Sequence, residues 1–165
     1  MLLPIFPLST TSYHFYPRAA TKVSGFLGRY DFQMDEKGRV SLPSAFRKEA
    51  EGEGFVLLQW EAPYLTLFPE TVWKDVQSRL LEFRRSDRSA SNHVREITSN
   101  AVEVSPDKQG RILIPGWLQE AASLEGTVVL SGNIDRVEIW NPEKFREAAK
   151  ARAEDFERFA HQIFG

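Results

Sequence analysis

Two arginines, each with a lysine nearby, are the residues of this chain best suited to binding chemistry. Arg39 follows Lys37 and Arg111 follows Lys108, each directly after an Asp-x-x-Gly segment. A guanidinium group can grip phosphate oxygens, or bind the N7 and O6 atoms of guanine through two hydrogen bonds. The alternative is a surface ion pair, which contributes about 0–1 kcal/mol to stability. We favour nucleic-acid contact for both arginines because a two-stranded ribbon fits the major groove of DNA.

Both segments belong to a longer internal repeat. Residues 35–43 (DEKGRVSLP) return as residues 107–115 (DKQGRILIP), an offset of 72 positions (107 − 35). The similarity continues without a gap from Tyr30 and Val102 to Lys74 and Arg146. Self-similarity at one fixed offset indicates a tandem of related units. We therefore divide the chain into an N-terminal extension (1–24), a first unit (25–78), a linker (79–99), a second unit (100–148) and the end of the last helix with its tail (149–165).

The aspartates and glycines of the repeat are predicted to build turns. Asp35 and Asp107 open each segment and can accept backbone N–H bonds, while Gly38 and Gly110 can adopt the left-handed conformation that closes such a turn. The turn chemistry explains these residue types without a ligand. We assign all four a structural role.

The surrounding pattern predicts an α+β fold. Alternation from Tyr30 to Met34 predicts a strand, and residues 25–40 are predicted to form a β-hairpin. Strand pairs are predicted at 55–60 with 64–68 and at 127–130 with 137–140. Short helices are predicted to begin after Pro43 and Pro115, and longer helices to begin at about Glu70 and at Asn141. Two such units suggest a pseudo-symmetric, strand-rich barrel with peripheral helices. The four tryptophans are predicted to be core residues: Trp60, Trp73, Trp117 and Trp140.

The linker at 79–99 is the most basic stretch and is predicted to be helical. Its arginines have two interpretations, which the sequence leaves open. A charge-rich helix is usually a solvated face, but the same side chains could extend a phosphate-binding surface. The candidate phosphate contacts are Arg84, Arg85, Arg88 and Arg95.

Composition argues against an enzyme, a metal site and a cofactor. The chain has no Cys, and its three His are scattered without the spacing of a helical metal site. No nucleophile elbow, phosphate loop or dinucleotide glycine run is present, so we predict no catalytic residues. No stretch approaches the roughly 20 apolar residues of a membrane span. Residues 1–24 are interpreted as a flexible extension or as the result of a start codon assigned too far upstream; an apolar arm that docks on a partner is the alternative. The net charge of −2 does not decide whether DNA is a partner.

The doubled motif closely resembles the MraZ family of bacterial transcriptional regulators. The resemblance is carried by residues 35–43, 107–115, 67–73 (LFPETVW) and 137–140 (VEIW), and it covers about residues 25–154. Two departures are visible. Residues 1–24 precede the usual family start, and residues 98–101 (TSNA) lack the Gly expected before the second unit's first strand.

The resemblance implies a function and an assembly. The fold would be the double swapped-hairpin barrel of the AbrB/SpoVT type, and the protein would form a ring-shaped homo-oligomer in the cytoplasm at the nucleoid. It would repress its own operon, in the division and cell wall gene cluster, by binding direct repeats in double-stranded DNA near the promoter. Arg39 and Arg111 would be the chief DNA-binding residues, with Lys37 and Lys108 beside them.

A protein-interaction module, such as an antitoxin-like partner without direct DNA binding, is the main alternative. A mobility-shift assay with the DNA upstream of the gene separates the two, since a pure protein binder gives no shift. An enzyme that uses carboxylate pairs ranks third, because the sequence offers no site for one.

Overall fold

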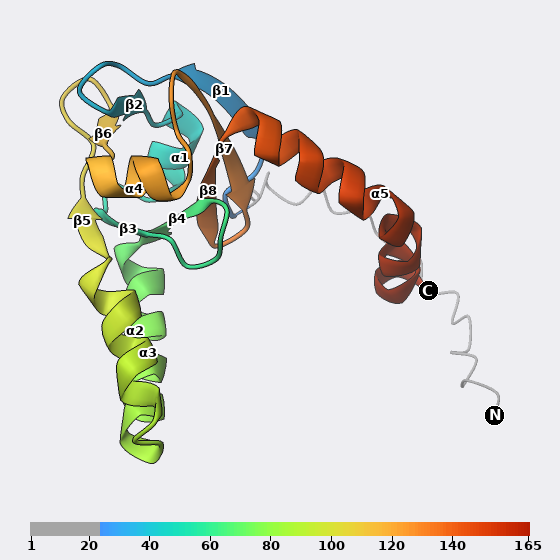
Figure 1. Cartoon of the computed structure of the whole chain (residues 1–165). Helices are drawn as coiled ribbons and strands as arrows, with labels where there is room; N and C mark the ends of the chain where they lie inside the picture. The colour runs from blue at the N-terminus through green and yellow to red at the C-terminus, as the bar shows by residue number, and fades with distance from the viewer. Residues whose placement is uncertain (1–23) are drawn as a thin grey trace, which may run out of the picture.

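Eight strands and five helices form an α+β fold in the computed structural model, which describes residues 24–165 (Figure 1). Six strands make one antiparallel sheet in the order β1-β7-β8-β4-β3-β5, and β2 with β6 makes a separate two-stranded ribbon. The strands are β1 (Arg29–Gln33), β2 (Arg39–Ser41), β3 (Phe55–Leu58), β4 (Leu65–Pro69), β5 (Val102–Val104), β6 (Arg111–Leu113), β7 (Thr127–Asn133) and β8 (Arg136–Trp140). The sheet is not closed into a barrel by its hydrogen bonds, and β1 and β5 are its edges.

The predicted strand pairs of each unit are present. β3 pairs with β4, and β7 pairs with β8, all antiparallel. β3 and β4 are buried at every position, which explains their continuous apolar runs, whereas β1 alternates between exposed and half-buried residues. The β4–β8 pairing joins the two units into a single sheet.

The prediction of a hairpin at residues 25–40 is wrong in its strand partners. The turn exists, but β1 pairs with β7 and β2 pairs with β6, so both strands take their partners from the other unit. Val40 and Ile112 face each other across the ribbon and are both almost fully buried. Pairing β2 with β6 places these two side chains on the same core, and burial of apolar surface is the main driving force of folding.

One core is built from both units. The buried cluster contains equivalent residues of the repeat, including Phe46 with Leu118 and Leu42 with Ile114. Phe46 packs edge-on against Phe26 and Tyr30, with ring centroids 5.6 and 5.2 Å apart. The short helices α1 (Ser44–Glu49) and α4 (Gly116–Ala121), predicted after each Pro, carry Phe46 and Leu118 into this core.

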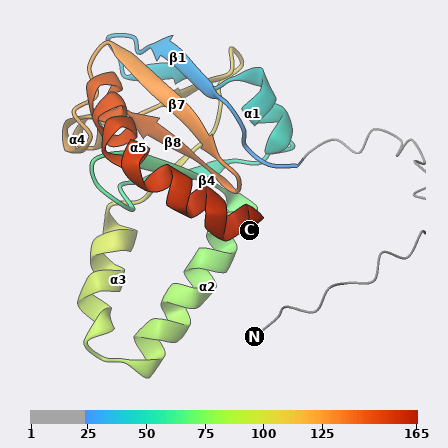
Figure 2. The same ribbon diagram turned by 90° about the vertical axis from the view of Figure 1, so that its right-hand side faces the viewer.

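Two helical parts project from the body. α2 (Glu70–Ser86) and α3 (Ala90–Ser99) form a helical hairpin below the sheet, and the predicted linker helix is divided between them (Figures 1 and 2). α5 (Pro142–Phe164) leaves the body beside β7 and extends away from it. The predicted cap at Asn141 is confirmed, since its side chain accepts hydrogen bonds from the backbone N–H of Glu143 and Lys144.

Two tryptophans expected in the core are exposed, and so is an apolar stripe on α5. Trp140 is buried and Trp73 half-buried, but Trp60 is 39% exposed and Trp117 56% exposed, so the prediction is wrong for these two. The far end of α5 presents an apolar stripe to solvent, with Phe156 64%, Phe159 55% and Ile163 60% exposed. These residues recur at helical spacing on one face, and α5 extends beyond the sheet that could have covered them.

Except for Ser24, the predicted N-terminal extension at residues 1–24 lies outside the described residues. Among residues 24–165, none of the helices combines the length and apolar character needed to cross a membrane.

Candidate nucleic-acid interface

The ribbon of β2 and β6 brings both repeated arginines to one surface. Its register places Arg39 opposite Leu113, and Ser41 opposite Arg111, with Val40 and Ile112 between them facing the core. Successive residues of a strand point to opposite faces. Arg39 and Arg111 therefore share the outer face, in diagonal positions, at a typical spacing of about 7–8 Å for such neighbours.

Each arginine is held by the aspartate of its own turn. Arg39 Nε donates to Asp35 Oδ2 at 2.7 Å, and Arg111 Nε donates to Asp107 Oδ2 at 3.1 Å. Arg111 Nη1 also lies 3.9 Å from Asp35 Oδ2, so the two turns are electrostatically linked. The ion pairs that the sequence left as an alternative are therefore present. The Nε–H group of Arg39 is occupied by its hydrogen bond to Asp35, and this bond fixes the direction of the two terminal Nη groups.

The turns are built as their sequence predicts. Asp35 Oδ1 accepts the backbone N–H of Lys37 and of Arg39, and Asp107 Oδ1 accepts those of Gln109 and Arg111, all at 2.9 Å. In each turn the N–H of the arginine is the main cause that lowers the pKa of the aspartate, and the arginine side chain lowers it further. Both carboxylates are therefore ionised at neutral pH and hold the guanidinium groups. Lys37 and Lys108 are exposed residues at the tips of the two turns.

The turn of one unit is locked to the return strand of the other. Gly38 O accepts the N–H of Ile114, and Gly110 O accepts the N–H of Leu42, both at 2.8 Å. Gly38 and Gly110 have φ angles of +84° and +77°, which suit glycine. The ribbon and both turns thus form one interlocked support.

Gly38→Ala is expected to destabilise the fold more than Gly52→Ala. Both glycines have positive φ, which costs about 1–2 kcal/mol for Ala. A Cβ at Gly38 would lie 2.7 Å from the backbone oxygen of Ile114, whereas no atom of residues 24–165 lies within 4 Å of one at Gly52. We expect the Gly38 variant to lose about 1–3 kcal/mol more of the free energy of unfolding, measured with denaturant. Equal losses of the free energy of unfolding for the two variants would contradict the close contact between the Gly38 turn and Ile114.

The linker arginines lie apart from the ribbon. Arg84 and Arg85 occupy the last turn of α2, Arg88 lies between the helices, and Arg95 is on α3. A 17-residue helix such as α2 is roughly 25 Å long, and Figure 1 shows its far end pointing away from β2 and β6. The structure therefore places Arg84, Arg85 and Arg88 away from Arg39 and Arg111.

Sequence reasoning missed Arg47 and Gln119, which occupy equivalent places in the two units. Arg47 Nε donates to Leu42 O at 3.2 Å, and Gln119 Nε2 donates to Ile114 O at 2.6 Å. Arg47 covers the Gly110 turn, and Gln119 covers the Gly38 turn. The signal was available, because 47 and 119 differ by the same 72 positions as the motif.

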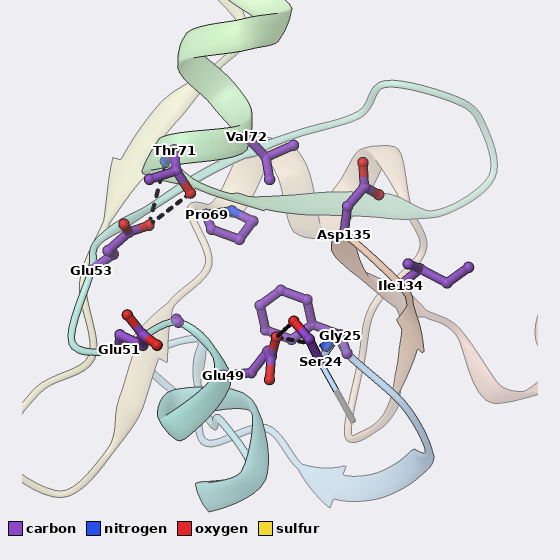
Figure 3. Close-up of a pocket in the computed structure, with 12 residues that line it drawn as sticks. Ser24, Gly25, Glu49, Glu51, Glu53, Pro69, Thr71, Val72, Ile134 and Asp135 are labelled. Atoms are coloured by element: carbon purple, nitrogen blue, oxygen red, sulfur yellow. Dashed lines mark hydrogen bonds between the residues drawn. The ribbon is translucent and has the colours of Figure 1, made fainter. Parts of the chain in front are cut away.

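An acidic hollow lies away from the ribbon. A cavity of about 370 Å³ is lined by Glu49, Glu51, Glu53 and Asp135, with Ser24 and Gly25 at its edge (Figure 3). Glu49 accepts the N–H of Gly25 at 2.6 Å, and Glu53 accepts the hydroxyl of Thr71 at 3.1 Å. Glu49 and Glu53 thereby tie loops together, and the clustered negative charge would repel phosphate.

The fold and the ribbon define a class: a tandem α+β protein that presents two Asp–Arg turns on one interlocked support. The family described as "MraZ protein, putative antitoxin-like" matches residues 26–95 and again residues 97–164. The chain belongs to this MraZ family. Both halves of the chain match the same family, as the internal repeat predicts.

Three relatives, each named transcriptional regulator MraZ, match most of the chain. The protein of Leuconostoc mesenteroides is 35% identical over 138 residues, which is 84% of this chain and 96% of that relative. The protein of Caldanaerobacter subterraneus is 37% identical over 83% of this chain and 95% of its own length. That of Moorella thermoacetica is 36% identical, with corresponding shares of 84% and 96%.

Proposed function

We propose that this protein is a sequence-specific DNA-binding transcriptional regulator whose ribbon of β2 and β6 contacts the major groove. The observation that carries the proposal is the placement of Arg39 and Arg111 on one outer face, each aimed by its own aspartate. The relatives' name, transcriptional regulator, supports the same conclusion. The two units exchange strand partners, and this supports the swapped-hairpin arrangement that the resemblance implies.

The ribbon has the chemistry that base readout needs. The guanidinium groups can bind guanine or phosphate, and Leu113 beside them is 52% exposed, suited to contact a thymine methyl group. Lys37 and Lys108 at the turn tips supply phosphate contacts that position the ribbon. The linker arginines at 84, 85, 88 and 95 are proposed to make at most peripheral phosphate contacts, because Arg84 and Arg85 lie at the far end of α2 and Arg88 follows it, away from the ribbon.

The regulator is proposed to act as a repressor of its own operon, bound as a ring to direct repeats near the promoter, in the cytoplasm at the nucleoid. The exposed stripe of Phe156, Phe159 and Ile163 supports self-association, since an apolar helix face of this kind is typical of an interaction surface. Head-to-tail contacts between identical subunits generate rings when the rotation closes. Linked subunits raise effective concentration, so one modest ribbon contact in each protomer suffices for tight binding.

DNA titration tests this proposal directly. The full-length protein is titrated into a duplex from the region just upstream of its gene and into a shuffled duplex of the same composition, at several salt concentrations. We expect specific binding that falls steeply with salt, since phosphate contacts release counterions. Equal affinity for the two duplexes would contradict sequence-specific recognition.

One observation favours a second function, the docking of a protein partner. Trp60 and Trp117 are exposed at the rim of a hollow of about 510 Å³ between α3 and α4, and exposed tryptophans are typical of interface hot spots. The "antitoxin-like" description of the family agrees with this candidate. In the same titration, absence of binding to any upstream duplex would favour it.

A further inference from the structure

The two halves of the ribbon are nearly symmetric in geometry but not in charge. Arg47 and Gln119 donate to equivalent carbonyl oxygens, those of Leu42 and Ile114, and each covers the turn of the opposite unit. Arg47 therefore adds a positive charge beside the Asp107–Arg111 turn. The Asp35–Arg39 turn has a neutral amide in the same place.

Arg47 also differs from the two ribbon arginines in its partners. In the described part of the chain, no carboxylate oxygen lies within 4.0 Å of its guanidinium, whereas Arg39 and Arg111 are both paired with aspartates. Its Nε donates a hydrogen bond to the backbone oxygen of Leu42. Its Nη1 lies over Gly110, 2.8 Å from the position that a Cβ atom of residue 110 would occupy. The residue is exposed, so its positive charge is available to an anion from solvent.

We propose that Arg47 and Lys108 form a site over the Gly110 turn, next to Arg111, and that this site binds one phosphate of the DNA backbone. The proposal rests on the proposed DNA binding and adds to it a site that the repeated motif does not contain. An Arg binds phosphate through parallel N–H donors, and a guanidinium fixed at one edge loses less entropy on binding. The second turn thereby becomes the stronger phosphate-binding half of the ribbon, because Gln119 offers no charge to the first.

The chain itself supplies a substitution that removes the charge and keeps the fold. Gln119 shows that a glutamine at this position can bond the carbonyl oxygen and cover the turn. Arg47→Gln therefore copies the other unit, and Gln119→Arg makes the reciprocal change. Lys48→Gln is the matched control, since it removes one charge from the next residue of α1, and adjacent helical residues point about 100° apart.

Binding of the upstream duplex is measured by fluorescence anisotropy between about 50 and 300 mM salt for the wild type and these variants. For Arg47→Gln we expect about tenfold weaker binding and a slope of log K against log salt reduced by about one. Gln119→Arg should raise the slope by about one and strengthen binding. The double exchange should restore the wild-type slope, which a purely structural role of Arg47 would not do.

The outcomes separate the two proposals. If the wild type binds and Arg47→Gln matches Lys48→Gln in affinity and slope, the phosphate site is wrong and the DNA-binding function stands. If the wild type does not bind the duplex, both are wrong. Denaturant unfolding of Arg47→Gln should match the wild type, and a weaker affinity accompanied by a wild-type slope would also overturn the proposal.

Discussion

The double variant Arg39→Ala, Arg111→Ala is expected to lose specific DNA binding by at least about 100-fold while it still folds and assembles. Each well-placed Arg–guanine contact is worth about 1–3 kcal/mol, and both arginines lie on the outer face of one ribbon. The measurement is anisotropy with the upstream duplex, with size determined by light scattering on the same samples.

The fold should survive because the turns do not depend on the guanidinium groups. Asp35 and Asp107 keep their hydrogen bonds to backbone N–H groups when the side chains are truncated. The surface ion pairs that are lost are worth about 0–1 kcal/mol each. The matched control is Arg84→Ala, Arg85→Ala, which removes two charges from the end of α2, away from the ribbon. A double ribbon variant that binds no worse than this control would contradict the interface.

Phe156→Asp with Phe159→Asp is expected to disrupt the proposed oligomer and to weaken DNA binding by about 100-fold or more. The two rings are 64% and 55% exposed on α5, and charges in an apolar contact between subunits would be desolvated without partners. Separate protomers lose the gain from linked binding sites, which is about 10²–10⁴-fold. Analytical ultracentrifugation gives the mass, and anisotropy gives the affinity.

The control for the assembly variant places the same number of carboxylates on the opposite face of α5. Arg158 and His161 lie roughly 140–200° around the helix from Phe156, given 3.6 residues per turn. Arg158→Asp with His161→Asp should leave the mass unchanged. If both pairs of substitutions dissociate the oligomer, or neither does, the stripe is not the subunit contact.

Local chemistry made the turns predictable from sequence. Asp-x-x-Gly-Arg encodes its own hydrogen bonds within five residues, so Asp35 and Asp107 behave as expected. The strand partners were less predictable. β2 and β6 are short, and their alternation of apolar and polar side chains would be the same whichever strand each of them paired with. The pairing of Val40 with Ile112 depends on a core shared by both units, which no single segment of the sequence reveals.

From the sequence, only residues of the repeated motif could be singled out for the candidate site. Arg39 and Arg111 were found because they repeat, whereas Arg47 was missed because its counterpart, Gln119, differs. The sequence left two interpretations of the linker arginines open, and the length and direction of α2 place Arg84 and Arg85 away from the ribbon. The exposure of the stripe on α5 could not be predicted, because periodicity shows an apolar face without showing whether anything in the chain covers it.

Hydroxyl-radical footprinting of the DNA upstream of the gene tests the central claim most directly. With the wild-type protein, we predict evenly spaced protections that disappear when Arg39 and Arg111 are both replaced by Ala. Protections that persist unchanged in this variant, or a wild-type protein that protects no site, would contradict an account in which the ribbon reads DNA.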